Sequence, residues 1–195
     1  MRVIAGVAKG VPLRAPGGPP NHTRPTTDRV REAVFSLLAD WAGTIGGSAE
    51  EQLAGLALLD LYAGSGAVAI EAMSRGAARA TAVDSSLAAV AAIRANAQAA
   101  KVTVTAARAP VADFLKRPPS ALFDIVWLDP PYGLAAGAAD EVLSLVTAGW
   151  LAPDGLVALE RSARDAGPNW PSGLVSHSSR RYGETVVHFA QEATQ

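Results

Sequence analysis

The sequence predicts an α/β fold in which a mostly parallel sheet is covered by helices on both faces. From residue 56 onward, short apolar runs alternate with longer segments of helical periodicity, as expected of successive β-α units. The runs are apolar throughout, which predicts strands buried on both faces. Near the C-terminus, Tyr182-Gly183-Glu184 separates two strand-like runs and predicts an antiparallel hairpin. The expected sheet therefore has seven strands, and its last pair is antiparallel.

The boundaries of these elements follow from where the apolar runs and the helical segments begin and end. The expected strands are 56–62, 79–84, 102–106, 122–128 and 155–160, followed by hairpin strands 174–182 and 184–191. The expected helices are 67–74, 87–100, 111–116 and 138–148, and they are rich in alanine.

Residues 1–50 are expected to form an extension before the main domain, which occupies 51–195. The extension begins with a β-hairpin of strands 2–5 and 11–15, and a Gly-Gly-Pro-Pro segment then breaks the chain. A helix follows, with Thr26 or Thr27 as its N-cap and Gly43 at its end. Its apolar residues lie on one face: Val30, Val34, Leu37, Leu38 and Trp41.

Composition excludes several classes of protein. The chain has 195 residues, of which 49% are apolar, enough for one substantial core. No run approaches the roughly 18 apolar residues of a membrane span, and the N-terminus lacks the layout of a secretory signal. The absence of cysteine excludes disulfides, thiolate metal sites and a cysteine nucleophile, and the three histidines are far apart. We expect a cytoplasmic monomer without a metal.

Positive charge is concentrated at the N-terminus, although the net charge of the chain is −1. Residues 1–31 contain six basic residues against one acidic residue, Asp28. This concentration predicts phosphate contacts, and the planar guanidinium of arginine suits them well. The alternative is a basic arm that is merely solvated. The predicted RNA-binding residues are Arg2, Lys9, Arg14, Arg24, Arg29 and Arg31.

A glycine-rich segment lies where the first strand of the main domain turns into the next helix. It runs from Asp60 through Tyr62, Gly64 and Ser65 to Gly66. The glycines allow a tight turn and a close approach of the backbone to a ligand, while the following helix directs its N-terminal amides at that ligand. The same pattern also fits a dinucleotide site or a tight packing turn without a ligand.

Asp84 ends the next strand, where a carboxylate can accept both hydroxyls of a ribose. It can also cap the helix that begins near Ser85, and the two roles can coexist. The first half of the main domain therefore predicts a cofactor that contains adenosine, without distinguishing a nicotinamide dinucleotide from S-adenosyl-L-methionine.

The sequence Asp129-Pro130-Pro131-Tyr132 directly follows a buried strand and should lie beside the glycine loop. Two prolines fix the backbone and remove two N–H donors, so carbonyls and the Asp129 carboxylate remain as acceptors. Such a corner suits the exocyclic amine of a base, with Tyr132 stacked on the ring. This chemistry predicts methyl transfer from S-adenosyl-L-methionine by positioning, with neither a metal nor a covalent intermediate. The alternative is a rigid exit from the strand.

Three segments make the chain resemble the RsmD-type methyltransferases, which modify the N2 amine of a guanine in 16S ribosomal RNA. They are 24–35, the glycine loop with the helix after it (59–77), and 124–132, and the closing Arg181-Tyr182-Gly183-Glu184-Thr185 hairpin adds to the likeness. The resemblance implies a class I (Rossmann-like) methyltransferase fold. It also implies that residues 24–31 cover the cofactor pocket and that the N-terminal hairpin touches 16S ribosomal RNA or the assembling small subunit.

The resemblance and the motifs together give the expected site. Asp129, Pro130 and Tyr132 are the predicted catalytic residues. The predicted cofactor contacts are Thr26, Asp60, Tyr62, Gly64, Ser65, Gly66, Asp84, Ser85, Pro110, Val111 and Asp129. Pro110 stands where similar enzymes often place a polar side chain against adenine, so we expect backbone groups, or Asp113, to replace it.

Other functions compatible with the motifs are methylation of DNA adenine N6 or of a protein glutamine amide. A non-catalytic scaffold that binds S-adenosylmethionine or RNA is an alternative of another class, which the intact Asp129 to Tyr132 corner argues against. Glu71 and Glu160 are candidates for pocket groups, but we interpret them as structural carboxylates in salt bridges. No histidine is given a role, and the four tryptophans are expected to pack.

Overall fold

A seven-stranded, mostly parallel sheet forms the centre of the protein, as the sequence predicts. The computed structural model describes residues 1–17, 28–131 and 137–193. Its strands run in the order β3-β2-β1-β4-β5-β7-β6, in which β1 to β5 are parallel and β7 is antiparallel to both of its neighbours. The strands are β1 (Ala57–Leu61), β2 (Arg79–Asp84), β3 (Thr105–Arg108), β4 (Phe123–Leu128), β5 (Leu151–Ser162), β6 (Leu174–Tyr182) and β7 (Thr185–Glu192).

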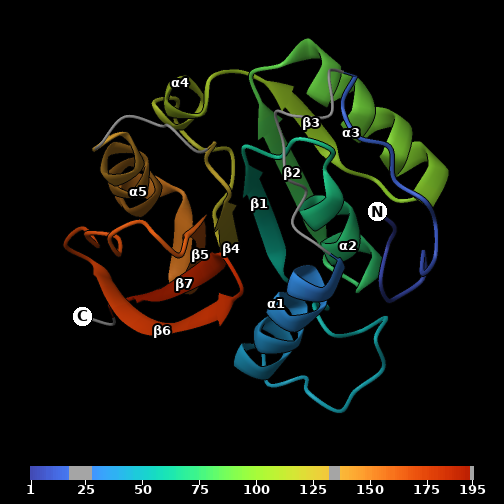
Figure 1. The fold of residues 1–195 in the computed structure, drawn as a ribbon, viewed down its shortest axis with the longest axis horizontal. Coiled ribbons are helices and arrows are strands. Elements are labelled where there is room, and N and C mark those ends of the chain that lie inside the picture. The colour runs from blue at the N-terminus through green and yellow to red at the C-terminus, as the bar shows by residue number, and fades with distance from the viewer. Residues whose placement is uncertain (18–27, 132–136, 194–195) are drawn as a thin grey trace.

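Helices cover both faces of this sheet (Figure 1). One face packs against α1 (Asp28–Trp41), α2 (Ala67–Ser74) and α3 (Leu87–Ala100). The opposite face packs against α4 (Val111–Leu115) and α5 (Ala138–Gly149). Because the strands are buried on both sides, alternate residues of one strand enter different cores. Leu58 lies in the core under α1 to α3, whereas Leu59 lies in the core under α4 and α5.

Local capping explains why α2 and α3 begin and end as predicted. Gly66 precedes α2 with φ +75°, a conformation that an L side chain rarely adopts. The Ser86 hydroxyl accepts a hydrogen bond from the Ala89 amide and caps α3. Lys101, with φ +55°, then ends α3 in the left-handed region.

Two strands, β3 and β5, differ from their predicted limits by more than one residue. β5 begins at Leu151 rather than Gly155, because the chain continues through Pro153-Asp154-Gly155 with a shift of register against β4 instead of turning away. β3 begins at Thr105 rather than Val102. Val102 and Val104 pack against a small core formed by the N-terminal segment, α2 and α3, and sheet pairing starts only after them.

The N-terminal segment is a hairpin of a looser kind than predicted. The two arms face each other through one isolated antiparallel bridge, Arg2 with Pro12, and neither arm forms a regular strand. The predicted strands 2–5 and 11–15 are therefore wrong as elements. The physical reason is that Pro12 has no N–H to donate, while the amides of Ile4 and Ala5 donate to the carboxylate of Glu71 in α2. The hairpin is held by its own backbone hydrogen bonds, Val3 to Val11 and Gly10 to Val3, and also by these contacts with the main domain.

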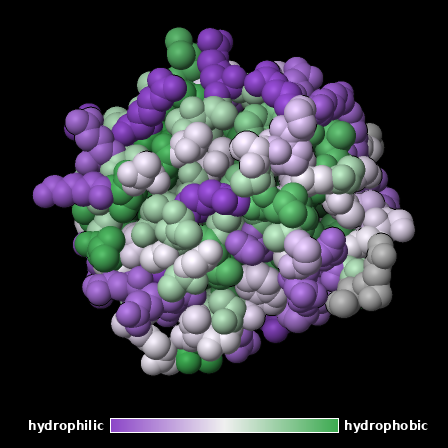
Figure 2. Space-filling view, turned by 180° about the vertical axis from the view of Figure 1, so that it is seen from behind, coloured by the Kyte–Doolittle hydropathy of each residue, from purple (hydrophilic) through white to green (hydrophobic). Residues whose placement is uncertain are grey.

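Among the described residues, no helix is both long enough and apolar enough to cross a membrane. On the face that Figure 2 shows, hydrophobic and hydrophilic residues are interspersed.

Candidate active site

Four carboxylates converge at the carboxyl ends of neighbouring strands. In β1, β2, β4 and β5, the residues two positions before the acidic residue all lie in the core under α1 to α3. Since side chains alternate along a strand, the acidic residues that follow face the same side. They are Asp60 on β1, Asp84 on β2, Asp129 directly after β4 and Glu160 on β5. Carboxyl ends of parallel strands are the usual place of ligands in such sheets.

The glycine loop after β1 has the shape of a ligand cradle. Gly64 has φ +53°, and a Cβ added to it would meet nothing within 4 Å. At Gly66 a Cβ would lie only 3.0 Å from Ile93, so glycine is needed there for packing of α2 on α3. Tyr62, which opens the loop, is a non-glycine residue with φ +63°. The open space over Gly64 beside the start of α2 leaves room for the adenosine-containing cofactor that the sequence predicts.

Asp84 fixes the loop in place. One carboxylate oxygen accepts the Gly64 amide at 2.9 Å, and the other accepts the Ser86 amide at 2.9 Å. Asp84 therefore joins the glycine loop to the start of α3. It is partly exposed, so lone pairs remain for a ribose hydroxyl.

Asp60 lies below the glycine loop rather than in the open site. It is 2% exposed, and its carboxylate accepts the Ala69 amide of α2 at 3.1 Å. Burial raises the pKa of Asp60 to about 7, and the charge of Asp84 contributes further. The Asp60 side chain thus supports the loop from beneath, and a cofactor contact at this residue stays a prediction.

Asp129 continues the pairing of β4 with β1, because its amide donates to the Leu61 carbonyl at 3.3 Å. Pro130 is buried and Pro131 is exposed, so the backbone turns out of the sheet at this corner. Burial raises the pKa of Asp129 well above its ordinary value, and the charges of Glu160 and Asp60 add to the shift. Asp129 is therefore a stronger base than an exposed carboxylate. Tyr132 lies outside the described residues.

The other predicted cofactor residues lie around the same edge. Pro110 is exposed directly before α4, and Val111 is buried in its first turn. The Ala109 amide donates to the Asp84 carbonyl at 3.1 Å, which brings this turn beside β2. Ser85 is exposed, whereas Ser65 is 9% exposed and its hydroxyl faces the sulfur of Met1. Thr26 lies outside the described residues.

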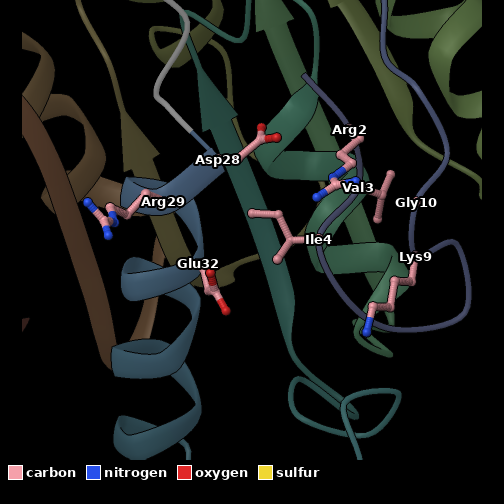
Figure 3. Close-up of a pocket in the computed structure, with 8 residues that line it drawn as sticks. All are labelled: Arg2, Val3, Ile4, Lys9, Gly10, Asp28, Arg29 and Glu32. Carbon is pink, nitrogen blue, oxygen red and sulfur yellow. The ribbon is translucent and has the colours of Figure 1, made fainter.

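Four of the predicted RNA-binding side chains are exposed, namely Arg2, Lys9, Arg14 and Arg29. A pocket of about 290 Å³ lies between the hairpin and the start of α1. Arg2, Lys9 and Arg29 line it together with Asp28 and Glu32, over an apolar base of Val3 and Ile4 (Figure 3). In Figure 3 the Arg29 guanidinium points away from the hairpin. Arg24 lies outside the described residues.

Arg31 is predicted to contact RNA, but the structure buries its side chain. It is 1% exposed and lies inside the protein, where its guanidinium donates to the Arg2 carbonyl and to the Asp28 carboxylate. Its Nε lies 3.8 Å from an oxygen of Glu71, which is fully buried and also pairs with Arg75 at 2.8 Å. The position of Arg31 on the packing stripe of α1, one turn before Phe35, explains its burial. Glu71 is a structural carboxylate, as predicted.

Two anchoring residues were not identified from the sequence. Asn96 on α3 is buried and accepts the Arg14 amide while donating to the carbonyls of Arg14 and Ser65. Ser74 on α2 accepts the Ala8 amide and donates to the Ala5 carbonyl. Both are polar residues in helices rich in alanine. That pattern could have indicated that their side chains bind buried backbone groups.

The described residues contain no group of three or more histidine, cysteine, aspartate or glutamate side chains arranged to hold a metal ion.

Comparison with known proteins places the chain in a family. Residues 1–191 match the family described as Conserved hypothetical protein 95. Ribosomal RNA small subunit methyltransferase D of Escherichia coli K12 is 31% identical over 201 residues, which cover 100% of this chain and 91% of that protein. The solved structure of a candidate methyltransferase from Escherichia coli has a TM-score of 0.81 and 30% identity, covering 100% of this chain and 99% of that one.

A second solved structure, of a hypothetical protein from Thermus thermophilus, has a TM-score of 0.76 and 27% identity, covering 97% of this chain and 98% of that one. Family, relatives and fold agree over nearly the whole length of the sequence. The chain therefore belongs to the Conserved hypothetical protein 95 family, that of the RsmD-type ribosomal RNA methyltransferases.

Proposed function

We propose that this protein transfers a methyl group from S-adenosyl-L-methionine to the N2 amine of a guanine in 16S ribosomal RNA. The observation that carries the proposal is the acceptor corner at Asp129 and Pro130, set beside an open glycine loop. The name of the Escherichia coli relative supports a small-subunit ribosomal RNA as the substrate. Such a substrate would place the enzyme in the cytoplasm, as free protein or on the assembling small subunit.

The residues around the glycine loop suit S-adenosylmethionine. The space over Gly64 would receive the cofactor, Asp84 would accept its ribose hydroxyls, and the turn at Pro110 and Val111 would lie against its adenine. When bound, the cofactor supplies an electrophilic methyl on a sulfonium. The chain itself has to hold the amine in line with that methyl and to exclude water.

Asp129 and Pro130 would orient the amine. The amine lone pair of guanine is delocalised into the ring and is a poor nucleophile. Hydrogen bonds from the two N–H groups to the Asp129 carboxylate and the Pro130 carbonyl favour a pyramidal nitrogen that points at the methyl. As the N–C bond forms and the bond from the methyl to sulfur breaks, the nitrogen becomes positively charged, and the raised pKa of Asp129 suits it to take the released proton.

The hairpin and the first turn of α1 would hold the RNA. Arg2, Lys9 and Arg29 line a pocket beside the site edge, and exposed basic groups of this kind bind phosphates. The Met1 sulfur lies 3.9 Å from the Ser65 hydroxyl of the glycine loop, so RNA held by the hairpin would reach the methyl-transfer edge.

Labelled S-adenosylmethionine tests the substrate. The purified protein would be offered unmodified 16S ribosomal RNA, partly assembled small subunits, DNA and a peptide release factor. We expect label in the RNA, and mass mapping should locate it as N2-methylguanine. Label confined to DNA or to the release factor would contradict the substrate, and cofactor binding without any transfer would favour the scaffold alternative.

Replacing Asp129 by alanine tests the chemistry. Asp129→Ala should lower kcat by about 10²–10⁴-fold because an acceptor and base is removed. Isothermal titration should show near-normal affinity for S-adenosylmethionine, since the glycine loop and Asp84 remain. Retained turnover would refute the role given to this carboxylate.

A further inference from the structure

Glu160 is a second carboxylate beside the Asp129 corner. It is 6% exposed and lies near the end of β5, where the preceding residue, Leu159, is in register with Leu128 of β4. The next positions along the two strands are therefore Glu160 and Asp129. Both side chains face the core under α1 to α3, and neighbouring strands are about 4.7–4.9 Å apart. The negative charge of Glu160 contributes to the raised pKa of Asp129, which agrees with this proximity.

Two neighbouring carboxylates suit the pair of donor groups on one edge of guanine. On guanine the N2 amine is followed directly by the ring N1–H, so two donor groups lie side by side. In adenine and cytosine, the ring nitrogen beside the amine carries a lone pair instead. A carboxylate can only accept hydrogen bonds while it is ionised. A second carboxylate next to the amine site therefore suits guanine and repels the other two bases.

We propose that Glu160 selects guanine by accepting the ring N1–H of the target base, while Asp129 receives the N2 amine. This inference rests on the proposed function and assigns recognition of the base to the Glu160 carboxylate. A carboxylate has about four acceptor positions, so Glu160 can hold a protein partner and the base together. A base with a lone pair at this position would place that lone pair against the buried charge of Glu160. The two acceptors repel each other, so such a base binds poorly.

The base analogue 2-aminopurine separates recognition of the ring N1–H from methyl transfer. It keeps the amine at the same ring position but has a lone pair in place of N1–H. We would place it at the target position, found by mass mapping, in an otherwise identical RNA. The measured quantity is the ratio of kcat/KM for guanine to kcat/KM for 2-aminopurine, at one pH and for each protein variant. Any general loss of activity, including a shift of the pKa of Asp129, cancels in this ratio.

The wild-type protein should prefer guanine, and Glu160→Gln should reduce the preference by about tenfold to a hundredfold. The amide of glutamine can donate to the lone pair of 2-aminopurine, so the analogue is no longer repelled. Glu160→Asp keeps the charge and should restore part of the preference. The matched control is Glu51→Gln, which removes the same charge from an exposed residue outside the site and should leave the ratio unchanged.

The outcomes distinguish the inference from the proposed function. An unchanged ratio in a folded Glu160→Gln protein that binds S-adenosylmethionine would overturn the role of Glu160. If that variant does not fold, the wild-type protein still decides, because equal methylation of guanine and 2-aminopurine would overturn the inference. A wild-type protein that methylates neither base but labels DNA would overturn the proposed function itself.

Discussion

At the scale of single residues, burial decides what each charged group can do. Arg31 and Arg29 are two positions apart on α1, yet the first is enclosed with Glu71 while the second is exposed. Asp60 and Asp84 lie at or next to the ends of adjacent strands, but Asp60 is buried whereas Asp84 is partly exposed and keeps lone pairs for a ligand. Charge counts along a sequence cannot make this distinction, because it depends on which face of an element a side chain occupies.

The buried Asp60 should make stability depend on pH. The pKa of Asp60 is about 7 in the folded protein against 3.8 ordinarily, so the folded state binds more protons between these values. Stability from this group is full below about pH 4 and is lost as pH rises to about 7, at a limiting ~1.4 kcal/mol per pH unit. Asp60→Asn should remove this slope while still accepting the Ala69 amide.

Urea unfolding at several pH values between 4 and 8 checks this. The free energy of unfolding of Asp60→Asn, taken relative to wild type, should rise with pH. Parallel curves for the two proteins would show that Asp60 does not titrate in this range.

At the scale of elements, the sequence predicts best where capping and burial agree. The limits of α2, α3, β2 and β6 match the expectation, because Gly66 precedes α2, Ser86 caps α3, and Gly183 follows β6. The irregular form of the N-terminal arms could not be predicted, since the amides of Ile4 and Ala5 donate to Glu71, which is remote in the sequence. For the same reason Glu160 was interpreted as structural: its place beside Asp129 comes from the register of β5 on β4.

Glu71 on α2 should be essential for joining the hairpin to the main domain. It accepts the Ile4 amide at 2.7 Å and the Ala5 amide at 3.0 Å, and it neutralises two buried arginines. Glu71→Gln would leave Arg31 and Arg75 without a counter-charge at this position. We expect a loss of about 3–5 kcal/mol in the free energy of unfolding.

Hydrogen exchange locates the effect of this change. The amides of Ile4 and Ala5 should exchange faster in Glu71→Gln, whereas the centre of β4 should be less affected if the protein remains folded. The exposed Glu51→Gln provides the control. A change below about 0.5 kcal/mol, the usual range for surface substitutions, would mean that the arginines find other partners.

At the scale of the whole molecule, the basic N-terminal segment packs on α2 and α3, the helices that follow the strands carrying Asp60 and Asp84 (Figure 1). This arrangement predicts that RNA affinity and chemistry can be changed separately. Replacing Arg2 and Lys9 together by glutamine should weaken RNA binding and leave S-adenosylmethionine binding unchanged.

Salt dependence measures how many phosphates are involved. For single-stranded RNA, the slope of log affinity against log salt should fall by about 0.7 for each phosphate that the Arg2 and Lys9 double variant no longer binds. Arg94→Gln, at an exposed position of α3, controls for the removal of a positive charge alone. An unchanged slope in the double variant would remove the hairpin from the RNA-binding surface.

The anchoring of the hairpin also bears on how the chain folds as it leaves the ribosome. The Ile4 amide binds Glu71, which is 67 residues later in the chain, and the Arg14 amide binds Asn96, which is 82 residues later. Residues 1–14 therefore cannot take their final position until α2 and α3, which are synthesised after them, have emerged. During synthesis the segment remains a loose basic arm, and its attachment to α2 and α3 is a late event in the maturation of the enzyme.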